Sequence, residues 1–235
     1  MPSDVRDSIE RGWRELAAID EALERGEIDE AGWHRAVVAI VVPAYLAGAT
    51  PWEQSGKSGD RAGWERGRRP IMAAVDRDGA FLDVGCANGF LMESIRAWAA
   101  EDGRDVEPYG LEIAPELAAL ARRRLPHWAD RIFVGNACEW IPRRHFDFVR
   151  TGLDYAPPTR RRALVEHLLD RVVAPGGRLI IGVFNEEKDE RRTEEAVRSW
   201  GFEVAGRVDA DHRDPRVAYR VLWLDAESSA DAKTR

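Results

Sequence analysis

The sequence predicts an α/β protein in which a mostly parallel, seven-stranded sheet is covered by helices on both faces. After Asp78, strand-like and helix-like segments alternate along the chain, which is typical of a doubly wound sheet. Before that point, apolar residues recur with helical spacing, which predicts an N-terminal helical cap. With 235 residues, of which 44% are hydrophobic, the chain is long enough to bury the core of one such domain.

The N-terminal part predicts three helices, over residues 3–25, 29–43 and 64–75. Gly26 ends the first helix, and the missing N–H of Pro43 should kink or stop the second. A polar segment rich in turn-forming residues, 50–60, precedes the third. We therefore expect residues 1–70 to form a cap or lid beside the main domain, residues 71–225.

The second of these helices is apolar on all sides in its middle. Such a helix is buried, either against the rest of the protein or against a partner chain. Burial within the protein is the simpler arrangement for a single helix, but a homodimer formed through the N-terminal helices stays open.

The main domain begins with five strands over residues 80–84, 106–113, 131–134, 146–151 and 178–184, with helices over 90–100, 115–125 and 159–173 between them. After a helix over 190–200, two further strands are predicted over 202–208 and 217–224. The roughly eight residues between them cannot hold a crossover helix, so this last pair should be antiparallel. The polar end, 226–235, should be a flexible tail.

Composition narrows the function classes. Acidic residues outnumber basic ones by 42 to 35, so no overall basic field attracts nucleic acid, and a nucleic-acid partner is not expected unless Arg160, Arg161 and Arg162 form a basic patch beside the site. Two cysteines without paired metal-ligand spacing predict neither a disulfide framework nor a metal. The most apolar stretch is too short to cross a bilayer, and no secretory pattern is evident. A cytoplasmic protein without a membrane partner is expected.

The strongest chemical signal is the run from Phe81 to Leu91. A buried strand delivers Asp83 to its carboxyl end, and Gly85 and Gly89 then allow a tight turn whose backbone can approach a ligand closely. The spacing differs from the dinucleotide pattern G-x-G-x-x-G, and a carboxylate here would repel a pyrophosphate, which disfavours an NAD-dependent oxidoreductase. An aspartate suits a ligand with an ammonium group and no phosphates, such as the methionine half of S-adenosylmethionine.

At these residues the sequence resembles the class I, Rossmann-like S-adenosylmethionine-dependent methyltransferases, over about Gly79 to Asp225. The run Asp83-Val-Gly-Cys-Ala-Asn-Gly89 looks like the family's first motif, with Ala87 in place of the middle glycine. The Pro175-Gly-Gly turn and the antiparallel last pair also look like the family. The resemblance implies the strand order 3-2-1-4-5-7-6, with the last strand antiparallel, and S-adenosyl-L-methionine as cofactor, S-adenosyl-L-homocysteine as product and no metal.

The resemblance also implies roles for individual residues. Glu112, at the end of the second strand, would hold the ribose hydroxyls, Ile113 would flank the adenine, and Asn136 would accept a hydrogen bond from the adenine amino group. The full set of cofactor-binding residues expected from the resemblance is Asp83, Gly85, Cys86, Ala87, Asn88, Gly89, Glu112, Ile113, Asn136, Ala137 and Thr151.

Methyl transfer mainly requires alignment of the acceptor with the methyl group, so a general base is optional. The segment after the fourth strand should lie beside the methyl group, where Asp154 could accept a proton or bind a cationic acceptor and Tyr155 could orient the acceptor. Cationic and aromatic residues before the first strand could meet the cofactor carboxylate or an anionic acceptor: Trp52, Lys57, Trp64, Arg68 and Arg69.

The sequence thus predicts a methyltransferase that acts on a small-molecule acceptor. Two alternatives stay open, an RNA methyltransferase and a non-catalytic, cofactor-binding partner subunit.

Overall fold

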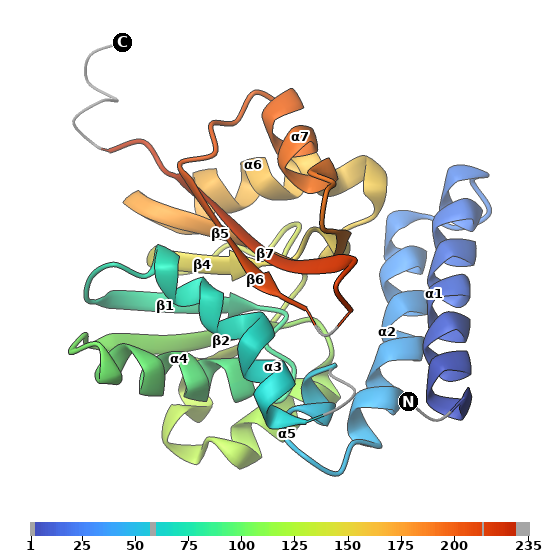
Figure 1. The fold of residues 1–235 in the computed structure, drawn as a ribbon, viewed down its shortest axis with the longest axis horizontal. Helices are drawn as coiled ribbons and strands as arrows, with labels where there is room; N and C mark the ends of the chain where they lie inside the picture. Colours follow the sequence, from blue (N-terminus) through green and yellow to red (C-terminus); the bar gives the residue numbers. More distant parts are fainter. Residues whose placement is uncertain (1–2, 57–59, 213, 229–235) are drawn as a thin grey trace.

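The computed structural model describes residues 3–56, 60–212 and 214–228, and its centre is one seven-stranded sheet (Figure 1). The strands lie in the order β3-β2-β1-β4-β5-β7-β6, which confirms the predicted order. Their bounds are Gly79–Val84 for β1, Val106–Glu112 for β2, Ile132–Val134 for β3, Phe146–Thr151 for β4, Val173–Glu187 for β5, Gly206–Asp211 for β6 and Val217–Asp225 for β7.

Strand directions also agree with the sequence. The pairs β1–β2, β1–β4, β2–β3 and β4–β5 are parallel, whereas β7 runs antiparallel to both β5 and β6. The predicted sixth strand began too early, because Phe202 and Val204 pack against the hydrophobic core before strand pairing begins at Gly206. The Pro175-Gly-Gly segment lies inside β5, where the pairing with β4 shifts register between Phe146 and Phe148.

Helices cover both faces of the sheet. On one face, α4 (Phe90–Glu101) and the segment before β1 pack on side chains that alternate along the strands, such as Phe81, Phe148 and Ile180. On the other face, α6 (Arg161–Arg171) and α7 (Arg192–Ser199) cover Leu82, Val149 and Ile181. A further helix, α5 (Pro115–Arg124), packs beside α4 through Met92 and Ala121. No helix within the described residues is long and apolar enough to cross a membrane.

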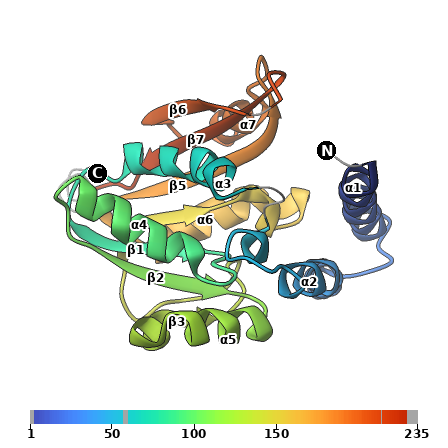
Figure 2. The same ribbon diagram turned by 60° about the horizontal axis from the view of Figure 1, so that its bottom comes forward.

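The N-terminal helices α1 (Ser3–Glu24) and α2 (Glu30–Leu46) form a pair beside the sheet, with α1 on the outer side (Figure 2). Val38, Val42 and Tyr45 of α2 pack against the cluster that Ala87, Ala114 and Leu117 form. Because Ala87 follows β1 and Ala114 follows β2, α2 lies across the carboxyl ends of these two strands. This contact explains part of its apolar surface.

The second helix does not end at Pro43, so the prediction of its C-terminal boundary was wrong. The helix continues for one turn to Leu46, and the N–H of Ala47 still donates to the Pro43 carbonyl at 3.0 Å. Proline at this position removes the single hydrogen bond to the Ala39 carbonyl. Contacts of Val42 and Tyr45 with the domain offset that loss.

The third predicted helix is divided in two. The α-helix α3 (Arg61–Arg68) begins where the Asp60 side chain accepts a hydrogen bond from the Gly63 N–H at 2.7 Å, and a 3₁₀ segment, Arg69–Ala74, follows it. Pro70 explains the change, since it has no N–H to continue the α-helical pattern. This arrangement directs α3 across the face of the sheet, near β6 and β7 (Figure 1).

Candidate functional site

The loop between β1 and α4 has an unusual backbone. Gly85, Ala87 and Gly89 have positive φ angles of 72°, 48° and 76°, and Ala87 is the one non-glycine residue with positive φ in the described part of the chain. Left-handed residues at alternate positions turn the backbone sharply out of the strand. At Gly85 a side chain has no room, because an added Cβ would lie 2.6 Å from Cζ of Tyr155. The loop therefore presents bare backbone at the carboxyl end of β1.

Glu112 fixes this loop to the end of β2. Its Oε2 accepts a hydrogen bond from the Ala87 N–H at 2.8 Å, and its Oε1 accepts one from the Ala114 N–H at 3.0 Å. The residue is 5% exposed, and burial raises the pKa of its carboxyl group. Each carboxylate oxygen has a second lone pair, so the group can accept two further hydrogen bonds. Ile113 is half-buried directly after it.

The Asn88 side chain forms hydrogen bonds within the protein. Its Nδ2 donates to the Pro51 carbonyl at 2.8 Å, and its Oδ1 accepts from the Phe90 N–H at 3.1 Å. The residue is fully buried. Asn88 thus links the loop to the segment between α2 and α3, and its carbonyl accepts a further hydrogen bond from Nη1 of Arg124 at 2.8 Å, so Asn88 has a structural role.

Two other predicted residues also have structural contacts. The Asn136 Oδ1 accepts a hydrogen bond from the Cys138 N–H at 3.0 Å, which closes the turn after β3 next to buried Ala137. The Cys86 side chain points into the core beside Gly110, where an added Cβ would lie 2.6 Å from its sulfur. Burial raises the pKa of Cys86, so this thiol remains protonated.

A buried ion pair joins β1 to β4. Nη1 of Arg150 lies 3.3 Å from Oδ1 of Asp83, and both side chains are almost fully buried. Burial raises the pKa of Asp83 to about 6, although Arg150 acts in the opposite direction. For Arg150, burial lowers the pKa, but Tyr155 and Asp83 raise it by more. The Arg150 Nε has no hydrogen-bond partner in the described residues.

Both predicted catalytic residues lie at this end of β4, in the 3₁₀ turn Leu153–Tyr155. The Tyr155 hydroxyl accepts a hydrogen bond from Nη1 of Arg150 at 2.9 Å, and its ring covers Gly85. Burial raises the pKa of Tyr155, so it is a neutral phenol that can orient a ligand. Asp154 is exposed beside it, and the buried Thr151 hydroxyl donates to the Gly152 carbonyl at 3.1 Å.

Of the cationic and aromatic residues before β1 that were predicted to meet a ligand, some lie at the site and others do not. Trp64 is buried and its Nε1 donates to the Ser55 hydroxyl at 2.7 Å, whereas Arg69 pairs with Glu101 on the surface, so neither is at the site. Trp52 packs near the Phe90 ring, and Lys57 lies outside the described residues. Arg68 is brought to the site, since its guanidinium lies 4.2 Å from the centre of the Phe184 ring.

Three residues at the site, Arg150, Tyr45 and Phe184, were not predicted from the sequence. For Arg150 a signal was present, because an arginine inside an apolar strand must be paired. Tyr45 contributes from α2, and burial raises its pKa to about 12. No local pattern distinguishes it, because its place depends on how α2 crosses the sheet.

The arginines 160–162 do not form an open basic patch. Arg160 pairs with Glu30 at 3.1 Å and Arg162 with Glu166 at 2.8 Å, while the Nε of Arg161 is buried. Within the described residues, no group of three or more His, Cys, Asp or Glu side chains could hold a metal ion.

Comparison with known proteins agrees with this geometry. Residues 82–181 match the family described as "Methyltransferase domain". No curated protein matches the sequence.

Several solved structures share the fold. One is a 1,6-didemethyltoxoflavin-N1-methyltransferase from Burkholderia thailandensis, with bound 1,6-didemethyltoxoflavin and S-adenosylhomocysteine, which is 19% identical, with a TM-score of 0.61 over 86% of this chain and 92% of that one. A putative methyltransferase in complex with the Trm112 activator of Haloferax volcanii is 16% identical, with a TM-score of 0.59 over 80% and 97%. The N-methyltransferase NodS from Bradyrhizobium japonicum, with S-adenosylhomocysteine, is 16% identical, with a TM-score of 0.52 over 88% and 98%. At these identities the likeness concerns the fold.

Proposed function

We propose that this chain is a class I methyltransferase that transfers a methyl group from S-adenosylmethionine to a small-molecule acceptor, because residues 82–181 match the methyltransferase-domain family and the strand order is that of the class I fold. The observation that carries the proposal is the bare-backbone loop at Gly85–Gly89, bound to the Glu112 carboxylate through the Ala87 N–H at 2.8 Å. Two structures of similar fold contain S-adenosylhomocysteine, which supports this choice of cofactor.

The site residues fit the cofactor group by group. The Glu112 carboxylate retains two lone pairs after its contacts with Ala87 and Ala114, which suits the two ribose hydroxyls. Oδ2 of Asp83 makes no hydrogen bond with a described residue, so Asp83 can accept from the ammonium group of the methionine half. The missing side chain at Gly85 leaves room for the Tyr155 ring, so the cofactor would approach the loop backbone beside this ring. Ile113, Ala137 and the Asn136 amide would surround the adenine.

The bound cofactor would supply a sulfonium methyl group, which a nucleophile of the acceptor displaces in line. The chain's own contribution is then to orient the acceptor and exclude water. Tyr155 is held in place by Arg150 and can donate a hydrogen bond to the acceptor. Asp154 is exposed beside it and could take the proton that an amine or hydroxyl acceptor releases.

The helix α2 would act as the lid of this site. Its contacts with Ala87 and Ala114 place it directly over the cofactor-binding loops. Asn88 ties the loop to the residues that follow α2, so movement of this segment and occupancy of the site should be coupled. Residues 1–70 as the acceptor-binding cap, and a homodimer through the N-terminal helices, remain predictions.

A small-molecule acceptor is favoured over RNA by the charge distribution. Two of the three consecutive arginines at 160–162 are engaged with acidic residues, so they do not offer a free basic surface for a phosphate backbone. The solved structure with 1,6-didemethyltoxoflavin supports a small molecule as well, because a protein of similar fold binds one.

Methyl transfer itself is tested with S-adenosylmethionine carrying a radiolabelled methyl group. The protein is incubated with the macromolecule-free fraction of a cell extract, and labelled products are separated by chromatography. We expect a new labelled small molecule with the wild type and none with Glu112→Ala. Label that enters RNA in a parallel incubation, and no small molecule, would contradict the proposed acceptor class.

A further inference from the structure

Arg68 is a cation in a largely apolar setting. It is the last residue of α3, and its guanidinium lies 4.2 Å from the centre of the Phe184 ring and 5.6 Å from that of Trp64. It makes no hydrogen bond or ion pair with any described residue. Two other arginines near it do: Arg61 pairs with Glu65 and Arg69 with Glu101. A half-buried guanidinium with five unused N–H donors needs an anion.

A second buried guanidinium increases the excess of positive charge. Arg150 lies over the same Phe184 ring, 5.5 Å from its centre, and its Nε has no partner in the described residues. Its one carboxylate contact among those residues is Asp83. Burial and the like charge of Arg150 lower the pKa of Arg68 to about 10. Of the two guanidinium groups over this ring, Arg150 has a carboxylate partner at 3.3 Å and is also influenced by the Asp154 carboxylate, whereas Arg68 has no carboxylate within ion-pair distance among the described residues.

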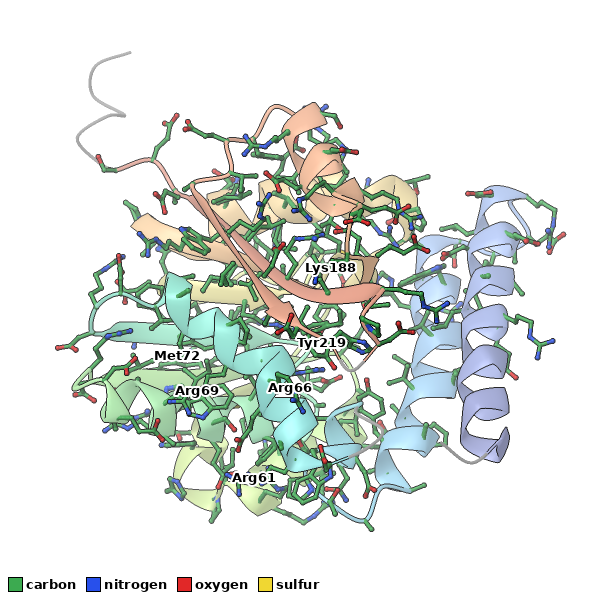
Figure 3. All side chains as sticks on the ribbon, in the orientation of Figure 1. Arg61, Arg66, Arg69, Met72, Lys188 and Tyr219 are labelled. Carbon is green, nitrogen blue, oxygen red and sulfur yellow. The ribbon has the colours of Figure 1, made fainter. Side chains whose placement is uncertain are left out.

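Arg68 lies on the β5 side of the site, although it is near enough to the end of β1 to act on the Asp83 carboxylate. Phe184 belongs to β5, and Gly67, which precedes Arg68, packs against Tyr219 of β7, where an added Cβ would lie 3.1 Å from the tyrosine ring. Figure 3 shows Tyr219 beside α3. Both strands lie on the far side of β4 from β1 and β2, which carry the Gly85–Gly89 loop and Glu112. In open α/β sheets a ligand binds outside the carboxyl ends of the strands, at the point where the strand order reverses. In this sheet that point lies between β1 and β4. Because the cofactor would lie on the side of β1 and β2, the acceptor would lie on the side of β5.

We propose that Arg68 binds a carboxylate of the methyl acceptor, so that the acceptor is a small carboxylic acid held against Phe184. The inference rests on the proposed function. A guanidinium that lies over an aromatic ring and has no hydrogen-bond partner keeps its N–H donors free for a two-point contact with a carboxylate. A bound cofactor would bring a sulfonium charge to a site that already holds Arg150 and Arg68, and an anionic acceptor would compensate it. Tyr45 and Tyr155 are near enough to influence the charge of Arg68 and would lie beside the same acceptor.

Calorimetric titration tests whether the region beside Arg68 binds a carboxylate. The protein is titrated with S-adenosylmethionine in the presence of benzoate, or of its neutral analogue benzamide, at constant ionic strength. We expect benzoate to tighten S-adenosylmethionine binding to the wild type about tenfold and benzamide to have little effect. Arg68→Gln should abolish the benzoate effect. Arg66→Gln, on the outer face of the same helix, should retain it.

A second titration identifies whose carboxylate Arg68 binds. S-adenosylhomocysteine should bind to Arg68→Gln within about threefold of the wild type. If its affinity falls by more than about tenfold while that of 5′-methylthioadenosine, which lacks the carboxylate, is unchanged, Arg68 binds the cofactor and the proposal is wrong. An absent benzoate effect, or an equal effect in both proteins, would also overturn it.

Arg68→Lys provides a second test in case Arg68→Gln does not fold. It keeps the charge but loses the two-point geometry, so the benzoate effect should fall severalfold and not vanish. Full retention would contradict the two-point contact. A wild type that binds neither S-adenosylmethionine nor S-adenosylhomocysteine would instead contradict the proposed function.

Discussion

Nη1 of Arg150 lies 3.3 Å from Oδ1 of Asp83, at the point where β4 and β1 run side by side. The contact makes an arginine part of the proposed cofactor site and places a positive charge beside the carboxylate that we expect to receive the cofactor's ammonium group. Arg150 also holds the Tyr155 hydroxyl at 2.9 Å. One residue therefore links the proposed cofactor-binding loop to the proposed acceptor side.

Removal of the arginine should strongly destabilise the protein. In Arg150→Met the buried Asp83 carboxylate loses its cationic partner, and we expect the free energy of unfolding to fall by about 3 kcal/mol at neutral pH. Urea unfolding followed by circular dichroism measures this loss. The double variant Asp83→Asn/Arg150→Met, which removes both charges, should recover most of it. A double variant as unstable as Arg150→Met would show that packing, and not the unpaired carboxylate, causes the loss.

Cofactor affinity should depend on pH through Asp83. Burial raises the pKa of this carboxyl group to about 6, so it is ionised at neutral pH and mostly protonated at pH 5. The proton must leave before the carboxylate can attract an ammonium group, and the affinity for S-adenosylhomocysteine should therefore rise between about pH 5 and 7. Calorimetry across this range measures the change, and Asp83→Asn should remove it. An unchanged pH dependence in that variant would assign the titration to another group.

The same raised pKa affects folding with the opposite sign. Because the native state of Asp83 binds a proton more tightly than the unfolded chain, its contribution to stability is present in acid and is lost as pH rises through about 6. Thermal melting without cofactor should show a decline in stability over this range that is absent in Asp83→Asn/Arg150→Met. Melting temperatures with parallel pH dependence in both proteins would contradict this assignment.

Gly85 and Gly103 provide a matched pair for testing the loop. Both have a φ of 72°, but an added Cβ at Gly103 meets nothing within 4 Å, whereas at Gly85 it would lie 2.6 Å from the Tyr155 ring. Gly103→Ala should cost about 1 kcal/mol of stability, because alanine is strained in this conformation. Gly85→Ala should cost about 2 kcal/mol more and weaken S-adenosylhomocysteine binding. Equal losses in thermal denaturation would contradict the close approach of Tyr155 to the loop.

Asn88 should control how firmly the segment after α2 is attached. Asn88→Ala leaves the Phe90 N–H and the Pro51 carbonyl without this partner, and we expect a loss of about 2 kcal/mol. Hydrogen exchange should also accelerate in residues 48–56. Asn136→Ala, which removes a hydrogen bond of the same kind from the turn after β3, is the control and should leave exchange in residues 48–56 unchanged. Unchanged exchange in Asn88→Ala would show that other contacts hold the segment.

The fold was predictable because its signals are local. Strand and helix patterns alternate over the main domain, and the short connection before β7 requires an antiparallel pair. The end of α2 was not predictable, because the contacts of Tyr45 with residues more than forty positions away offset the effect of Pro43. The boundary of α3 was misplaced for a simpler reason, since the cap at Asp60 lies in a segment that was interpreted only as a linker.

The candidate site was predictable where it is part of one continuous motif. Asp83, Gly85, Gly89 and Glu112 lie at the carboxyl ends of β1 and β2, as their sequence positions indicate. The hydrogen bond from the Asn88 side chain to the Pro51 carbonyl could not be anticipated, because Pro51 lies 37 residues earlier in the chain. The cluster of Arg68, Arg150 and Phe184 comes from three distant segments, and only the folded chain brings them together.

Calorimetric titration with S-adenosylmethionine and S-adenosylhomocysteine tests most directly whether the protein binds this cofactor. NAD serves as the control ligand, and Glu112→Ala is the variant for comparison. We expect saturable binding of one S-adenosyl ligand per chain, a clear loss of affinity in Glu112→Ala, and no binding of NAD. Failure of the folded wild-type protein to bind either S-adenosyl compound would contradict the proposed function.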